Sequence, residues 1–180
     1  TYGWKHIVVR ETEIRSERLP ESFRGYRIAQ ISDLHIGTYS YAPEKVREIV
    51  DSINARRPDL IVFTGDIINI YPEELVQFTE ELDRLEAPDG VYARMGNHDY
   101  CGYADYTPEE QDNAISRLQN LEKEAGLELL LNRNVIIRRG ADSLALIGIE
   151  YAGQPQFPCN GDVKLASEGL PEGIFKILLS

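Results

Sequence analysis

The sequence has few of the residues that cross-link secreted domains or build membrane spans. Among its 180 residues are only two cysteines, Cys101 and Cys159, which cannot form a disulfide framework. Two thiols in a reducing compartment are the favoured interpretation, and a single bridge between them is the alternative. No apolar run approaches the roughly 20 residues that a membrane-spanning helix needs, and no signal-peptide pattern opens the chain.

Positive charge is also scarce. Nineteen lysines and arginines stand against 30 aspartates and glutamates, which gives a net charge of −11. Because an acidic surface repels the phosphate backbone, the composition argues against a protein that binds duplex nucleic acid. The acidic charge does not exclude phosphate substrates, since bound cations can reverse the electrostatic field of a carboxylate-rich site. Length and composition predict one globular domain over residues 1–180.

Apolar periodicity predicts strands that alternate with helices. Strands are expected at 26–31, 60–63, 91–95, 135–138, 144–149 and 174–179, after a β-rich opening at 7–14. Helices are expected at 43–57, 72–85, 108–125 and 163–170. Alternation of this kind implies βαβ units with right-handed crossovers. The predicted fold class is therefore α/β, a mixed sheet with a parallel βαβ core.

Three polar clusters follow the inner strands. They are Asp33-Leu34-His35, Gly65-Asp66 and Gly96-Asn97-His98-Asp99. Ligands bind at the carboxyl ends of the strands in open α/β sheets, so the clusters are expected to meet at one edge. Each motif alone is weak, since an isolated aspartate is commonly a helix cap or a turn residue. Their order, each at the end of a strand, makes the combination specific.

The chemistry that these residues suit is two-metal hydrolysis. Asp33 and His35 are two residues apart at a strand end and can both reach one cation. Asp66 has two carboxylate oxygens and can bridge two cations about 3.5–4 Å apart, and Asn97 offers an amide oxygen to the second. Such mixed ligands suit two divalent ions of Mn, Fe, Zn or Ni, and the sequence does not choose between them.

The three clusters resemble the first three signature motifs of the calcineurin-like metallophosphoesterase superfamily, an Asp-x-His, a Gly-Asp and a Gly-Asn-His-Asp. The stretch 29–35 is most similar to a bacterial subgroup whose members often carry N-terminal membrane helices. The resemblance implies a calcineurin-like α/β sandwich that hydrolyses a phosphomonoester or phosphodiester. A binding or scaffold module that keeps this fold without turnover is the alternative.

The resemblance also implies a role for each residue. The four ligands named above would hold two cations bridged by a hydroxide, which attacks phosphorus in line. His98 would donate a proton to the leaving oxygen, and Asp99 would orient His98 through its other ring nitrogen. Retention of His98 with Asp99 favours an enzyme over a scaffold, because a scaffold has no need of a proton donor.

The sequence departs from the family in its histidines, which number only three: His6, His35 and His98. The family carries more of them in two later motifs, a lone His after a strand and a Gly-His-x-His. Because the sequence ends at Ser180, about where the lone His is expected, we expect a fragment that lacks the C-terminal part of the fold. Such a fragment would have little activity and would be prone to self-associate through exposed strand surface.

The remaining expectations concern location and surface residues. Thr1 stands where a methionine would begin a chain, so we expect a soluble domain, cytoplasmic or membrane-associated through a missing N-terminal segment, in a bacterium. His6 and Glu150 are left out of the site as ordinary surface or packing residues. Tyrosines in the loops after the motifs could form an aromatic rim for a substrate, and plain surface cover is the favoured interpretation. They are Tyr39, Tyr41, Tyr71, Tyr100, Tyr103 and Tyr106.

Overall fold

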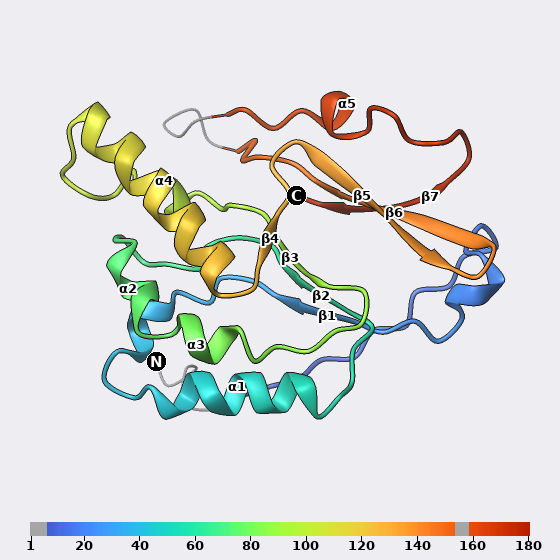
Figure 1. The fold of residues 1–180 in the computed structure, drawn as a ribbon, viewed down its shortest axis with the longest axis horizontal. Coiled ribbons are helices and arrows are strands. Elements are labelled where there is room, and N and C mark those ends of the chain that lie inside the picture. Colours follow the sequence, from blue (N-terminus) through green and yellow to red (C-terminus); the bar gives the residue numbers. More distant parts are fainter. Residues whose placement is uncertain (1–6, 154–158) are drawn as a thin grey trace.

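The computed structural model describes residues 7–153 and 159–180, which form a four-stranded and a three-stranded sheet with helices outside them (Figure 1). The first sheet is parallel and contains, in order, β1 (Ile28–Ile31), β2 (Leu60–Phe63), β3 (Val91–Ala93) and β4 (Glu128–Leu129). The second contains β5 (Arg133–Arg139), β6 (Asp142–Gly148) and β7 (Phe175–Leu179), and β6 pairs antiparallel with β5 and parallel with β7.

Along the sequence, most of the helices come between strands of the parallel sheet. The α-helices are α1 (Glu44–Asn54), α2 (Glu73–Val76), α3 (Thr79–Leu82), α4 (Pro108–Glu124) and α5 (Val163–Ala166). Short 3-10 turns are η2 (Glu21–Phe23), η3 (Ile36–Tyr39) and η4 (His98–Tyr100). None of the helices that the structure describes is long and apolar enough to cross a membrane.

Strand β2 shows why the molecule is layered. All its residues are buried, as expected for a strand that is covered on both faces. Ile61 and Phe63 pack in the cluster that contains the residues of α1, α3 and α4, whereas Leu60 and Val62 pack with Leu146 of the second sheet. Figure 1 shows these helices on one side of the parallel sheet and the three-stranded sheet on the other. The α/β sandwich expected from the sequence is confirmed.

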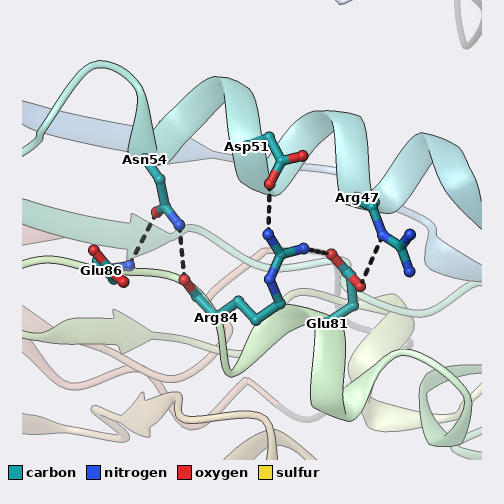
Figure 2. A network of polar contacts seen from close by, with 6 residues as sticks. All are labelled: Arg47, Asp51, Asn54, Glu81, Arg84 and Glu86. Atoms are coloured by element: carbon teal, nitrogen blue, oxygen red, sulfur yellow. Dashed lines mark hydrogen bonds and ion pairs between the residues drawn. The ribbon is translucent and has the colours of Figure 1, made fainter.

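A polar network joins α1 to α3 and the turn that follows it (Figure 2). Arg84, in the turn after α3, forms an ion pair with Asp51 of α1 at 2.6 Å and another with Glu81 of α3. The side chain of Asn54 donates to the carbonyl of Arg84 at 2.7 Å and accepts from the backbone of Glu86 at 3.0 Å. Because the arginine side chains of these pairs are exposed, each pair contributes only about 0–1 kcal/mol, and the network links the two helices.

The β-rich opening predicted at 7–14 is wrong. These residues form no strand, and the side chains of Val8 and Ile14 are 75% and 81% exposed. A strand exists only where a neighbouring backbone takes its hydrogen bonds, and no strand that the structure describes pairs with this segment. The apolar content of the segment was therefore a misleading signal. His6 lies outside the described residues.

Two other expectations need correction. The helix predicted at 72–85 is divided into α2 and α3, because the backbone departs from helical values at Phe78, whose φ is −116° and ψ −1°. The two-residue strand β4 was missed, since it is too short to show a periodicity. No disulfide joins Cys101, which is buried, to Cys159, which is exposed.

Candidate metal centre

The loops that follow β1 and β2 run side by side beyond the ends of these strands. The backbone amide of Asp33 donates to the carbonyl of Gly65 at 3.1 Å, and the amide of His35 donates to the carbonyl of Asp66 at 3.0 Å. Pairing of the parallel strands thus continues through both motifs. The expectation that the motifs converge at the carboxyl edge of the sheet follows directly from this register.

The backbone of both loops adopts an unusual conformation. Asp33, His35 and Asp66 have φ values of 52°, 44° and 56°, in the left-handed region that L-residues seldom occupy. Each such residue costs of order 1–3 kcal/mol and persists only where surrounding contacts over-determine it. Strain of this kind clusters at functional sites, so its concentration at three predicted metal ligands points to a site rather than to ordinary turns.

Two glycines let the second and third loops approach each other. A Cβ atom on Gly65 would lie 2.5 Å from the amide nitrogen of Gly96, and one on Gly96 would lie 2.6 Å from the amide nitrogen of Asp66. These gaps are closer than any real side chain tolerates. The glycines of the Gly-Asp and Gly-Asn-His-Asp motifs are therefore required by backbone contact.

The side chain of Asp99 joins the second and third loops through hydrogen bonds. Its side chain is fully buried, and its carboxylate accepts hydrogen bonds from the amides of Asp66, Ile67, Ile68 and Gly96 at 2.7, 2.9, 3.2 and 2.8 Å. Burial raises the pKa of Asp99 to about 6, and the backbone hydrogen bonds oppose this shift. The carboxylate thus acts as the common anchor of the second and third motifs.

The orienting role predicted for Asp99 belongs instead to a backbone carbonyl. The Nδ1 atom of His98 lies 2.5 Å from the carbonyl oxygen of Asn69, and the Nδ1 atom of His35 lies 3.1 Å from that of Ile68. Because a carbonyl only accepts, each Nδ1 carries the hydrogen and each Nε2 is left free. The prediction that Asp99 would contact the His98 ring is wrong, since four amides already occupy its carboxylate.

Three side chains come together as a donor group for a cation. Ligand atoms of His35, Asp66 and His98 all lie within 4.8 Å of one another, and all three residues are partly buried. One carboxylate oxygen of Asp66 accepts from the amide of His98 at 2.9 Å, which fixes the direction of the carboxylate. Nitrogen and carboxylate donors with carbonyl-held imidazoles are the arrangement that divalent transition metals take in proteins. The residues present therefore fit a metal.

The other two predicted ligands stand at the rim of this group. Asp33 is exposed, lies outside the three-residue group, and accepts a hydrogen bond from the Ser32 hydroxyl at 2.5 Å. The side-chain amide of Asn97 donates to the hydroxyl of Tyr103 at 2.9 Å, which leaves its oxygen for another partner. The structure thus gathers His35, Asp66 and His98, with Asn97 next to His98 in the chain and Asp33 exposed outside the group.

Sequence reasoning missed the residues that support the site. The carboxylate of Glu74 accepts from the amides of Asn69, Ile70 and Tyr71 at 2.7, 2.9 and 3.0 Å, and so fixes the loop whose carbonyl holds His98. A glutamate in the first turn after Pro72 was the available signal, because carboxylates there accept backbone amides.

A buried arginine was missed as well. Arg94 is 7% exposed and donates to the carbonyls of Thr64 and Ile149 at 3.2 and 3.3 Å. Burial lowers the pKa of its guanidinium, and the nearby acids act in the opposite direction. Its hydrogen bonds go to backbone oxygens, so it ties the parallel sheet to the end of β6 rather than pairing with the carboxylates of the site.

Comparison with known proteins agrees with this geometry. The sequence matches the family model for calcineurin-like phosphoesterases over residues 26–164, which is most of the chain. The chain belongs to this family, and the resemblance seen in its three motifs is confirmed.

Relatives within the family are diverse. The chain is 39% identical to the metallophosphoesterase YkuE of Bacillus subtilis over 100 residues, 54% of this chain and 34% of that protein. It is 31% identical over 165 residues to a transmembrane protein with a metallophosphoesterase domain from Danio rerio, covering 88% of this chain and 35% of that protein. Identity to the UDP-2,3-diacylglucosamine pyrophosphatase LpxG of Chlamydia trachomatis is 37% over 109 residues, 57% and 32% of the two chains. The matches span about a third of these relatives' lengths.

Proposed function

We propose that the full-length protein hydrolyses a phosphomonoester or phosphodiester at a dinuclear metal centre on the carboxyl edge of the parallel sheet. The observation that carries this proposal is the group of His35, Asp66 and His98, whose ligand atoms lie within 4.8 Å of one another. Membership of the calcineurin-like phosphoesterase family supports the same chemistry.

His35 and Asp66 would hold the first cation, together with Asp33 after a rotation of its side chain toward them. Asp66 would share its carboxylate with a second cation, and Asn97 would offer its amide oxygen to that ion. Bound there, divalent ions neutralise the charge that develops on the phosphoryl oxygens. The chain supplies a rigid frame for this purpose, since Asp99 holds the backbone of Asp66 and Gly96 in one position.

His98 would donate the proton that the departing oxygen needs. Its Nδ1 is held by the Asn69 carbonyl, so its Nε2 is the atom that can carry a proton to the substrate. The second candidate role for His98 is that of a third metal ligand, which its place in the donor group favours. These two roles make opposite demands on Nε2, because a proton donor holds a hydrogen there and a ligand must not.

The substrate we propose is a small phosphate ester. LpxG is named for a pyrophosphatase that acts on UDP-2,3-diacylglucosamine, and the Danio rerio relative is named as a transmembrane protein. These names support a phosphate ester at or near a membrane as the first class to assay. The acidic balance of the chain, with a net charge of −11, fits a small ligand better than a nucleic-acid duplex.

The test is an assay of the full-length protein on bis-p-nitrophenyl phosphate and on an alkyl phosphate, with Mn²⁺. Asp66→Ala is expected to abolish turnover of both compounds. If His98 donates the proton, His98→Ala slows the alkyl phosphate far more than the nitrophenyl ester, whose leaving group needs no proton. If His98 is a ligand, both rates fall together and Mn²⁺ binds more weakly. Wild-type protein that binds Mn²⁺ without turning over any phosphate ester would favour the scaffold alternative.

A further inference from the structure

Tyr103 lies in the loop after η4 and contacts the predicted site. The chain reverses at Cys101, whose φ of 55° is left-handed and ends the 3-10 turn. This reversal places the Tyr103 ring against the His98 ring, with centroids 4.4 Å apart and planes inclined by 31°. The Tyr103 hydroxyl also accepts a hydrogen bond from the side-chain amide of Asn97 at 2.9 Å. One side chain therefore contacts two adjacent residues of the Gly-Asn-His-Asp motif.

The hydrogen bond to the hydroxyl holds the Asn97 side chain with its nitrogen toward Tyr103. An asparagine offers a cation only its oxygen, and its nitrogen and oxygen exchange places when the amide turns over. Because the Tyr103 hydroxyl takes the nitrogen, the oxygen points away from Tyr103 and stays available. Partners of this kind, one bond removed from a metal, typically change metal affinity by about 10–100-fold when they are lost.

The ring limits the orientations that His98 can take. His35 meets the His98 ring edge-on at 4.6 Å and 80°, Tyr103 lies against its face, and the Asn69 carbonyl holds Nδ1. These three contacts come from three different loops, so the imidazole can neither tilt nor turn over without breaking one of them. The direction of Nε2 is set by the same contacts.

We propose that Tyr103 is a positioning residue of the phosphoesterase site, whose hydroxyl orients Asn97 as a metal ligand and whose ring holds His98. The proposal rests on the proposed function, because it assigns Tyr103 to the same site. It separates Tyr103 from the other tyrosines of the rim. Tyr71 is similarly exposed, at 46% against 50% for Tyr103, but its ring packs on Tyr106 with centroids 6.0 Å apart.

The test uses Tyr103→Phe, Tyr103→Leu and the matched control Tyr71→Phe in the full-length protein. Calorimetric titration with Mn²⁺ is expected to show that Tyr103→Phe weakens the Asn97-containing site about 10-fold, while Tyr71→Phe binds as the wild type does. Tyr103→Leu is expected to show the same loss of affinity and, with saturating Mn²⁺, a further fall in kcat of about 10-fold on the alkyl phosphate. Unfolding midpoints measured without metal should agree among all four proteins, which excludes a general loss of structure.

The outcomes separate the two proposals. A wild-type protein that binds Mn²⁺ and turns over substrate, with Tyr103→Phe equal to it in affinity, overturns the role of the hydroxyl. Equal kcat for Tyr103→Leu and the wild type overturns the role of the ring. A wild-type protein that binds no Mn²⁺ removes the proposed function and the inference with it.

Discussion

The two ends of the parallel sheet treat their aspartates in opposite ways. At the amino end, Asp59 and Asp89 share the guanidinium of Arg139 at 2.6 and 3.3 Å, and Tyr26 donates its hydroxyl to Asp89 at 2.8 Å. At the carboxyl end, the structure shows no lysine or arginine, within residues 7–153 and 159–180, in an ion pair with the aspartates of the motifs. The aspartates are ion-paired at the amino end, whereas at the carboxyl end the nearby cation, the buried guanidinium of Arg94, makes its hydrogen bonds to backbone oxygens.

The difference shows which end is built for stability. Arg139 also lies over the ring of Tyr26 at 4.6 Å, so its cluster contributes packing and charge together. The backbone at the carboxyl end instead lowers the stability of the fold, because three of its residues are held in left-handed conformations. Carboxylates without a direct ion pair, held on a strained backbone, suit a site that binds a cation.

The largest expected effect is that of Asp66→Asn. Asparagine keeps the oxygen that accepts from the His98 amide but removes the negative charge that cations need. Loss of a metal interaction worth several kcal/mol lowers kcat/KM on the order of 1000-fold. Steady-state assays with Mn²⁺ measure this loss, and urea unfolding without metal should change by less than about 1 kcal/mol. A variant with wild-type activity would place the reaction elsewhere.

Asp99→Asn should damage stability as well as activity. Its amide nitrogen would face backbone amides, because each carboxylate oxygen now accepts two of them. Leaving buried donors unpaired costs about 2–3 kcal/mol of unfolding free energy. Urea unfolding tests this, with Asp89→Asn at the amino end as the matched control, for which a smaller loss of about 1 kcal/mol is expected. Equal losses for both variants would contradict the contrast between the two ends.

Glu122→Gln should change how stability depends on pH. Glu122 is 1% exposed on α4, its Oε2 has no hydrogen-bond partner, and burial raises its pKa well above the usual value. The folded protein therefore keeps the proton where the unfolded chain, with a pKa of about 4.3, releases it. The stability that protonation confers is full below that value and is lost as the pH rises through the raised pKa.

We expect the wild type to lose unfolding free energy as the pH rises above about 4.3, with a flatter profile for Glu122→Gln. Once Glu122 is ionised, the variant should be more stable by about 1–2 kcal/mol, since it removes a buried charge. Guanidinium unfolding across this range, without metal, is the measurement. A variant that follows the wild-type profile would show that Glu122 does not titrate within the fold.

The smallest effect is expected at the amino end. Arg139→Leu leaves Asp59 and Asp89 without their cation, but these side chains are partly exposed and water compensates much of the loss. Unfolding free energy should fall by about 1 kcal/mol, and kcat/KM with Mn²⁺ should stay within twofold of the wild type. An activity loss comparable to that of Asp66→Asn would mean that the two ends are coupled.

Much of the fold was predictable because its signals are local. Strand 60–63 and the helices at 43–57 and 108–125 appear nearly as expected, since apolar period and proline positions define them. The opening at 7–14 was not predictable, because a strand depends on a partner that the segment itself does not encode.

The same distinction applies to the site: what depends on strand order was predictable, and what depends on loop conformation was not. Convergence of His35 and Asp66 follows from strand order, so the sequence indicated it. The supports of the site could not be found in this way. The Asn69 carbonyl beside His98 and the Tyr103 hydroxyl on Asn97 depend on how loops fold back. The sequence placed Tyr103 among the tyrosines of the rim without distinguishing it from them, and neither the type nor the spacing of Asn69 marks it before the loops are placed.

Anomalous diffraction from crystals of the full-length protein grown with Mn²⁺ tests the central claim most directly. We predict two peaks about 3.5–4 Å apart, one beside His35 and both in contact with the carboxylate of Asp66. Peaks at Asp59 and Asp89 instead, or none at the carboxyl edge of the sheet, would contradict the account.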